Sequence, residues 1–188
     1  MTLRLKALAL AVIAFFAISA CSTSTHGDHM NKGDIDYSVY DADAVMFAQM
    51  MIPHHEQAIE MADMALENTS NPAILELAAE IKAAQDPEIE QMRGWLETAG
   101  APEIGMEMHM GHMSGMLSEE DLDALRNARD AEFDRLFLEG MIEHHEGAID
   151  MAEDILDNDN EEVSALATAI IDAQTREIEL MESLLAEL

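Results

Sequence analysis

The chain has 188 residues, and its 39 acidic side chains against 9 basic ones give a formal net charge of −30 at pH 7. A surface this acidic repels phosphate backbones, which excludes nucleic acid as a partner. The single cysteine, Cys21, excludes an intrachain disulfide, so packing must hold the fold together. The 16 methionines and 8 histidines instead make the chain rich in thioether and imidazole groups.

Residues 1–20 have the layout of an export signal. Arg4 and Lys6 precede an apolar run over residues 7–18 that is short for a membrane span. Small residues then lead to Cys21, as in the lipobox of bacterial lipoproteins. We predict cleavage before Cys21, lipidation of its sulfur, and a lipid anchor in the cell membrane or outer membrane, facing the periplasm or the cell exterior. An ordinary signal peptide and a membrane helix are the alternatives.

The rest of the chain divides into a tether and one domain. Residues 21–35 are mostly polar, which predicts a flexible tether from the lipidated Cys21 that carries His26 and His29. Residues 36–188 have the length of a single domain.

This domain contains an internal repeat. Residues 51–62 return at residues 141–152, and a second segment that contains Gln85 and Glu88 returns with Gln174 and Glu177. Each copy predicts a helical hairpin, over 36–99 and 118–188, with a loop over 100–117 between them. Since neither hairpin can bury its apolar stripe alone, we predict an all-α four-helix bundle with pseudo-twofold symmetry.

Polar residues mark the expected helix ends. Asn71 and Pro72 predict an N-cap and a first turn in copy one, and residues 158–160 predict the same in copy two. Ser118, followed by three acidic residues, resembles a capping box that begins the second hairpin.

Helical spacing gathers imidazole and thioether groups on one face of each repeat, while Glu56 and Glu60 fall on the opposite face. Bundles that hold iron or manganese use Glu-x-x-His, but here methionine takes the place of that glutamate. Thioethers suit soft ions, so the pattern predicts a copper site, with Cu(I) favoured and Cu(II) or Ag(I) as alternatives. The other interpretation is that the histidines are core residues with satisfied hydrogen bonds and the methionines are filler. The candidate metal ligands are Met51, His54, His55, Met61, Met141, His144, His145 and Met151.

The loop between the copies is unusually rich in methionine and histidine. Its glycines and its lack of helical or strand period predict a mobile segment that can wrap a soft ion. The alternative is a flexible methionine-rich surface that binds an apolar patch on a partner. Together with His26 and His29 of the tether, the candidate auxiliary ligands are Met106, Met108, His109, Met110, His112, Met113 and Met116.

The doubled pattern Met-Ile-x-His-His-x-x-Ala-Ile-x-Met, each copy followed by Gln-x-x-Glu-Ile-x-x-Met, resembles the DUF305 family from about Tyr40 to the C-terminus. The resemblance implies a ferritin-like four-helix bundle and exported bacterial proteins that often accompany copper-resistance systems. Some members bind copper through Met and His, which implies the eight ligands named above. Copy one keeps the family's proline (Pro53) but has Ala44 where aspartate is common, whereas copy two has Asp134 but Glu143 in place of the proline.

We therefore predict an exported lipoprotein that sequesters copper, or hands it to another copper-handling protein, in metal resistance or homeostasis. The sequence contains no catalytic constellation, so we do not expect an enzyme. Two alternatives stay open. One is a metal-dependent ferritin-like oxidase, for example of Cu(I), which needs an open coordination position. The other is a helical interaction module that binds no metal.

Overall fold

The computed structural model describes residues 35–103 and 113–188. The described residues form helices and connecting turns without a strand, which confirms the all-α prediction. The helices are α1 (Ala42–Asn68), α2 (Pro72–Ala99), α3 (Glu119–Asn127), α4 (Asp130–Glu153) and α5 (Glu161–Leu185). Within the two described ranges, none of these helices is long and apolar enough to cross a membrane. The predicted signal peptide, Cys21 and nearly all of the tether lie outside the described residues.

Side-chain caps fix where the helices begin. The Asn71 side chain accepts a hydrogen bond of 3.1 Å from the backbone N–H of Ala73, and Pro72 occupies the first turn of α2, as predicted. Asn160 caps α5 in the same way, and the Ser118 hydroxyl accepts from the N–H of Asp121 at the start of α3. Gly100 ends α2 in the left-handed conformation, with φ of 65°.

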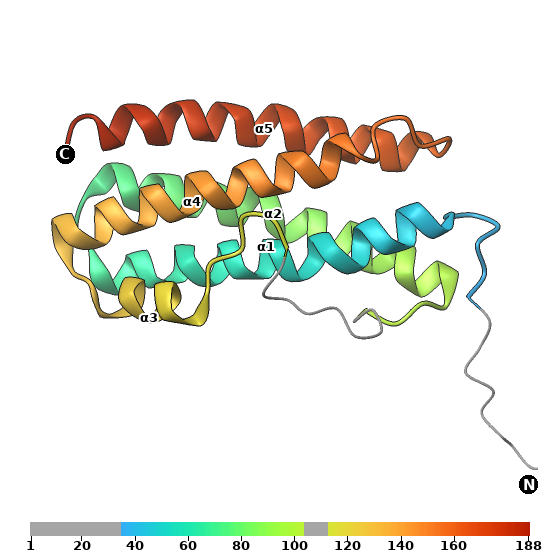
Figure 1. Ribbon diagram of the computed structural model, residues 1–188, viewed down its shortest axis with the longest axis horizontal. Helices are drawn as coiled ribbons and strands as arrows, with labels where there is room; N and C mark the ends of the chain where they lie inside the picture. Colours follow the sequence, from blue (N-terminus) through green and yellow to red (C-terminus); the bar gives the residue numbers. More distant parts are fainter. Residues whose placement is uncertain (1–34, 104–112) are drawn as a thin grey trace, which may run out of the picture. The chain divides into compact units, whose positions relative to one another are not determined.

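The long helices form two antiparallel hairpins, α1 with α2 and α4 with α5 (Figure 1). α1 packs against α4 and runs in the opposite direction, so the two first helices of the repeats meet at the centre of the bundle (Figure 1). We call the line of contact between α1 and α4 the seam.

The second hairpin contains an element that the sequence did not predict as separate. The helix begun by Ser118 stops after α3, because Ala128 and Arg129 are extended and Asp130 has a positive φ of 49°. The Asn68 amide donates to the carbonyls of Leu125 and Arg126, both at 3.2 Å, and so satisfies groups that the broken helix leaves free. α3 thereby packs across α1 and α4.

The apolar core has two clusters, one toward each end of the bundle. One contains Phe47, Trp95 and Ile170, and the other contains Phe133 and Ile81. Each of the two core clusters therefore contains residues from both repeats.

A hydrogen-bonded group ties α2 to α5 at the first cluster. The Trp95 indole N–H and the Tyr40 hydroxyl each donate to the Glu162 carboxylate at 3.0 Å, and the two rings stack with centroids 5.4 Å apart. This contact also holds the segment before α1.

Candidate metal centre

The repeated motif buries all four of its histidines. His54, His55, His144 and His145 each have 0% of their surface exposed, whereas Glu56 on the same helix is exposed. The face predicted from helical spacing is therefore the face that points into the bundle.

His54 and His144 meet across the seam. Their ring centroids are 3.8 Å apart and their planes are inclined by 41°. Because the two residues occupy equivalent positions of the two repeats, the pseudo-twofold axis passes between their rings. The two copies of the motif therefore face each other across the seam.

The other two histidines each contact a carboxylate of the second helix of their own hairpin. His55 Nε2 lies 2.8 Å from Glu88 Oε2, and His145 Nε2 lies 2.6 Å from Glu177 Oε2. An ionised carboxylate can only accept, so each Nε2 carries a hydrogen, and it is Nδ1 of each ring that is left to bind a metal ion. This is the arrangement by which an outer carboxylate orients a metal-binding histidine and raises its basicity.

His54 has the same tautomer for a different reason. Its Nε2 lies 3.1 Å from the backbone carbonyl oxygen of Ser114, which can only accept. The Nδ1 atoms of all four histidines are buried without a hydrogen-bond partner among the described residues, and so is Nε2 of His144. A buried polar atom without a partner costs free energy, so these nitrogens are candidates to bind a ligand. Since one nitrogen of a neutral His144 carries a hydrogen, each of the four rings offers at most one donor atom.

Burial keeps the central pair neutral. Burial first, and then the neighbouring His55 ring, lower the pKa of His54 to about 3, against the opposing hydrogen bond to the Ser114 carbonyl. Burial, and then the His54 ring, hold the pKa of His144 well below its ordinary value of 6.5. Neutral imidazole is the form that binds metal.

The methionines of the motif divide between the two ends of the core. Met51 shares a cluster with Met151, and Met61 shares the other with Met141. Each cluster thus combines one motif methionine from each repeat, because α1 and α4 are antiparallel (Figure 1). Met51 and Met61 of one copy therefore belong to different clusters. The bundle places thioethers from both copies on either side of the histidine pair.

Imidazole and carboxylate groups alone do not form a metal site among the described residues. Over residues 35–103 and 113–188, no group of three or more His, Cys, Asp or Glu side chains is placed to hold one metal ion. A site at the seam would need thioethers beside the imidazoles, which is a donor set for soft ions.

The end of the interhelical loop crosses the seam at the histidines. We call residues 113–117 the strap. A Cβ added to Gly147 would lie 2.1 Å from the Ser114 carbonyl oxygen, and one added to Gly115 would lie 2.3 Å from the Glu143 carbonyl oxygen. The strap thus contacts α4 through backbone that only glycine leaves room for.

The strap is held on the α1 side by Gln57, which stands at the repeat position of Gly147. The Gln57 side chain donates to the Leu117 carbonyl at 3.1 Å and accepts from the Leu117 N–H at 2.8 Å. Among the predicted auxiliary ligands, Met113 and Met116 are half-buried in the strap. The others lie outside the described residues, and these are Met106, Met108, His109, Met110, His112, His26 and His29.

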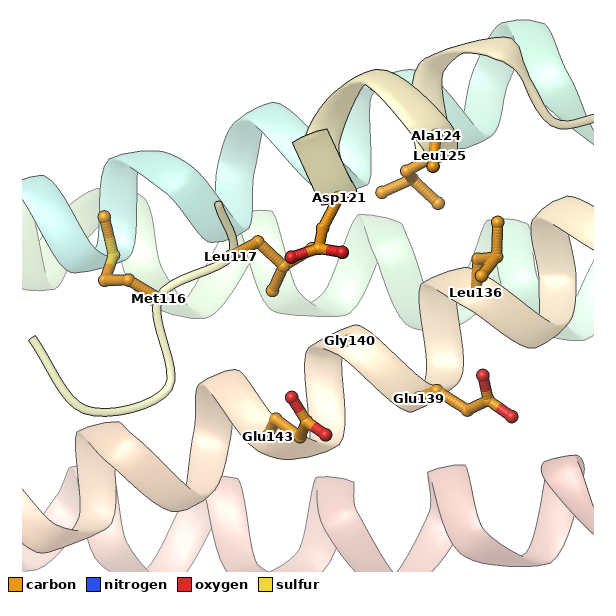
Figure 2. A pocket seen from close by; sticks show the side chains of 9 residues that line it. All are labelled: Met116, Leu117, Asp121, Ala124, Leu125, Leu136, Glu139, Gly140 and Glu143. Atoms are coloured by element: carbon orange, nitrogen blue, oxygen red, sulfur yellow. The ribbon is translucent and has the colours of Figure 1, made fainter. Parts of the chain in front are cut away.

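A cavity of about 220 Å³ opens beside the strap, between α3 and α4. Figure 2 shows the carboxylates of Asp121, Glu139 and Glu143 around it, with Met116 and Leu117 of the strap on one side. The strap and α3, which line this cavity, have no counterpart in the first repeat.

Sequence reasoning missed Glu88 and Glu177, although their segment was identified as part of the repeat. It also assigned no role to Gln85 and Gln174, whose buried amides have no hydrogen-bond partner among the described residues. The sequence nevertheless contains a signal for these four residues. A polar Gln-x-x-Glu pair that recurs on two otherwise apolar helix faces is difficult to explain by packing.

The family description "Domain of unknown function (DUF305)" matches residues 44–185. The chain belongs to the DUF305 family. No curated protein matches the chain. The match covers both repeats and the strap, so the family pattern includes every part of the site described above.

Solved structures of this family are similar to the chain over most of its length. A DUF305 fragment from Deinococcus radiodurans is 35% identical with a TM-score of 0.73, over 78% of this chain and 97% of that one. A DUF305 protein from Streptomyces coelicolor is 31% identical with a TM-score of 0.72, over 78% and 93%. CopM in its Cu(II)-bound form is 35% identical with a TM-score of 0.68, over 77% and 96%. CopM has also been solved with Cu(I) and with silver bound.

Proposed function

We propose that this protein is an exported lipoprotein that binds copper as cargo at the seam, and that it sequesters the ion or hands it to another protein. The observation that carries the proposal is the set of four buried histidines whose Nδ1 atoms all lack a partner among the described residues. Filler histidines in a packed core are expected to be hydrogen-bonded. These are hydrogen-bonded at three Nε2 atoms only, which leaves Nδ1 of His54, His55 and His145, and one nitrogen of His144, to bind an ion.

The chemistry of the donors supports copper, and Cu(I) in particular. Neutral imidazole binds either oxidation state, while the thioethers of Met51, Met61, Met141 and Met151 favour the soft Cu(I) ion. CopM, which is similar over 77% of this chain, binds Cu(I), Cu(II) and silver. The export signal and the Streptomyces relative, which is regarded as a secreted protein, support a site outside the cytoplasm.

Copper as cargo needs no turnover, and we propose no reaction. The role of the chain's own residues is to bind and to orient. Glu88 and Glu177 hold the tautomers of His55 and His145, and the Ser114 carbonyl holds that of His54.

An anaerobic Cu(I) titration against a competing chelator tests the proposal. The purified full chain is compared with a His54/His55/His144/His145→Ala variant that keeps the loop. The matched control replaces the other four histidines with alanine: His26, His29, His109 and His112. We expect tight binding to be lost in the first variant and kept in the control, with circular dichroism checking that each still folds.

The opposite pattern would move the binding site to the loop and tether. If the wild-type chain does not bind Cu(I), the copper proposal is rejected and the histidines must be explained by packing. A His54/His55/His144/His145→Gln variant covers the case in which the alanine variant does not fold.

A further inference from the structure

A second cavity, of about 270 Å³, opens between α1 and the end of α4. Three thioether side chains line it, Met46 and Met50 from α1 and Met151 from α4, together with the carboxylates of Asp43 and Asp154. Met46 and Met50 lie outside the repeated motif, and the copper site proposed above does not use them.

The repeat itself shows that packing does not require sulfur at these positions. Met46 and Met50 correspond to Leu136 and Gly140 of the second copy. These two line the cavity of Figure 2, which is the equivalent cavity at the other end of the seam. There the strap and α3 cover the space, and the α4 wall carries leucine and glycine. The cavity beside Asp43 gathers three methionines, whereas the cavity of Figure 2 has Met116 alone.

The exposure of the methionines is also unlike that of core filler. Met46 has 53% of its surface exposed, Met50 is half-buried, and Met151 has 9% exposed. The thioethers thus extend from solvent into the core, where Met151 shares a cluster with Met51. An exposed methionine gains little from the hydrophobic effect, but it is accessible to an ion.

The charges beside the cavity favour a cation. Asp154 is the C-cap residue of α4, where the helix dipole is negative and a carboxylate is unfavourable. Asp43 lies in the first turn of α1 on the other side of the cavity. A monovalent ion between them would offset this charge. Methionine has three rotatable side-chain bonds, so the three sulfurs can approach an ion smaller than the cavity.

We propose that Met46, Met50 and Met151 form a second site for a soft monovalent ion, Cu(I) or Ag(I), at the end of the seam away from α3. The site rests on the proposed copper function for its cargo, but it does not depend on the four buried histidines. Thioethers are neutral and soft donors, so the three sulfurs favour a soft monovalent ion over a hard divalent one.

Silver is the appropriate probe, because Ag(I) is diamagnetic and does not change oxidation state. Ag(I) is titrated into the full chain labelled with ¹³C at the methionine methyl groups, and the methyl resonances are followed by NMR. We expect those of Met46, Met50 and Met151 to shift together, in the wild type and also in the His54/His55/His144/His145→Gln variant. If they do not shift, or shift only when the histidines are present, the proposal is wrong.

Equilibrium dialysis gives the second readout. A Met46→Leu/Met50→Leu variant should bind about one Ag(I) ion fewer per chain than the wild type. The control is Met64→Leu, on the same helix and half-buried, but outside the cavity. An unchanged silver count in the double variant, or an equal loss in the control, would overturn the proposal. Loss of binding only in the histidine variant would instead support the seam site alone, so the two proposals fail separately.

Discussion

The imidazole rings of His54 and His144 lie with their centroids 3.8 Å apart at the seam, each contributed by one repeat. Both rings are fully buried, and burial keeps both uncharged at neutral pH. The pair is therefore a contact between two neutral bases, each with an unpartnered Nδ1. Such a contact is better explained by a shared cationic ligand than by packing.

The metal-free protein should lose stability in mild acid. The pKa of His54 is about 3 in the folded chain, against about 6.5 for an unfolded histidine. Between these values the unfolded state binds more protons, so the free energy of unfolding falls as the pH falls below about 6.5. We expect urea midpoints measured with chelator present to decrease steadily from pH 7 to pH 5. A His54→Gln/His144→Gln variant should show a smaller slope, and an equal slope would contradict the assignment.

Removal of the outer carboxylates should weaken copper binding without unfolding the bundle. Glu88→Ala and Glu177→Ala leave His55 and His145 without the acceptor that fixes their tautomers, and such losses typically cost about 10- to 100-fold in metal affinity. The glutamine variants keep an acceptor and should stay closer to the wild type. Glu90→Ala, on the exposed face of α2, is the matched control. ¹⁵N chemical shifts of the imidazoles report the tautomers directly, and unchanged tautomers in Glu88→Ala would refute this role.

Gly147→Ala should displace the strap. The new Cβ would lie 2.1 Å from the Ser114 carbonyl oxygen, so the strap or α4 must shift, at a cost of about 1–3 kcal/mol. Gly94→Ala is the control, because nothing lies within 4 Å of its Cβ, and it should stabilise α2 by about 0.5–1 kcal/mol. Chemical denaturation measures both values. Equal stability of the two variants would mean that the strap does not press on α4.

Glu162→Ala should destabilise the end of the bundle that contains Trp95. The Glu162 carboxylate accepts from Trp95, Tyr40 and Gln91, and the Trp95 hydrogen bond is the main reason that its pKa is lowered. Its contribution to stability is therefore present above the pKa of unfolded glutamate and is lost as the pH falls through the lower folded pKa. We expect a loss of about 1–2 kcal/mol at pH 7. A red shift of the Trp95 fluorescence should accompany it, and an unshifted spectrum would count against the contact.

The fold was largely predictable, because its determinants are periodic and repeated. The offset of the motif predicted two hairpins, and Asn71, Pro72 and Ser118 predicted helix starts that the structure confirms. The break between α3 and α4 was not predictable. At the break, the Asn68 amide donates to the carbonyls of Leu125 and Arg126 from a distant part of the chain, and no local signal marks such a contact.

The types of side chain in the candidate site were predictable, but which of them lie together was not. Helical spacing placed the four histidines inside, since one helix is enough to define a buried face. Which methionines accompany each other depends on the direction in which α1 and α4 cross. Antiparallel packing groups Met51 with Met151, whereas helical spacing shows only that Met51 and Met61 share one face of α1. The Ser114 carbonyl could not be predicted at all, because it is a backbone atom of a loop.

Positions 57 and 147 are equivalent in the two repeats, but they carry glutamine and glycine, which a symmetric assembly of two identical hairpins would not allow. In a homodimer of identical hairpins, both positions would carry the same residue. Two glutamines would leave no space for a segment to pass over the histidines, since even a Cβ at position 147 is too close to Ser114. Two glycines would leave no side chain to bind Leu117. Because the two halves are joined in one chain, one position can leave space for the strap while the other position binds it. A symmetric assembly carries the same residue at both positions and cannot do both.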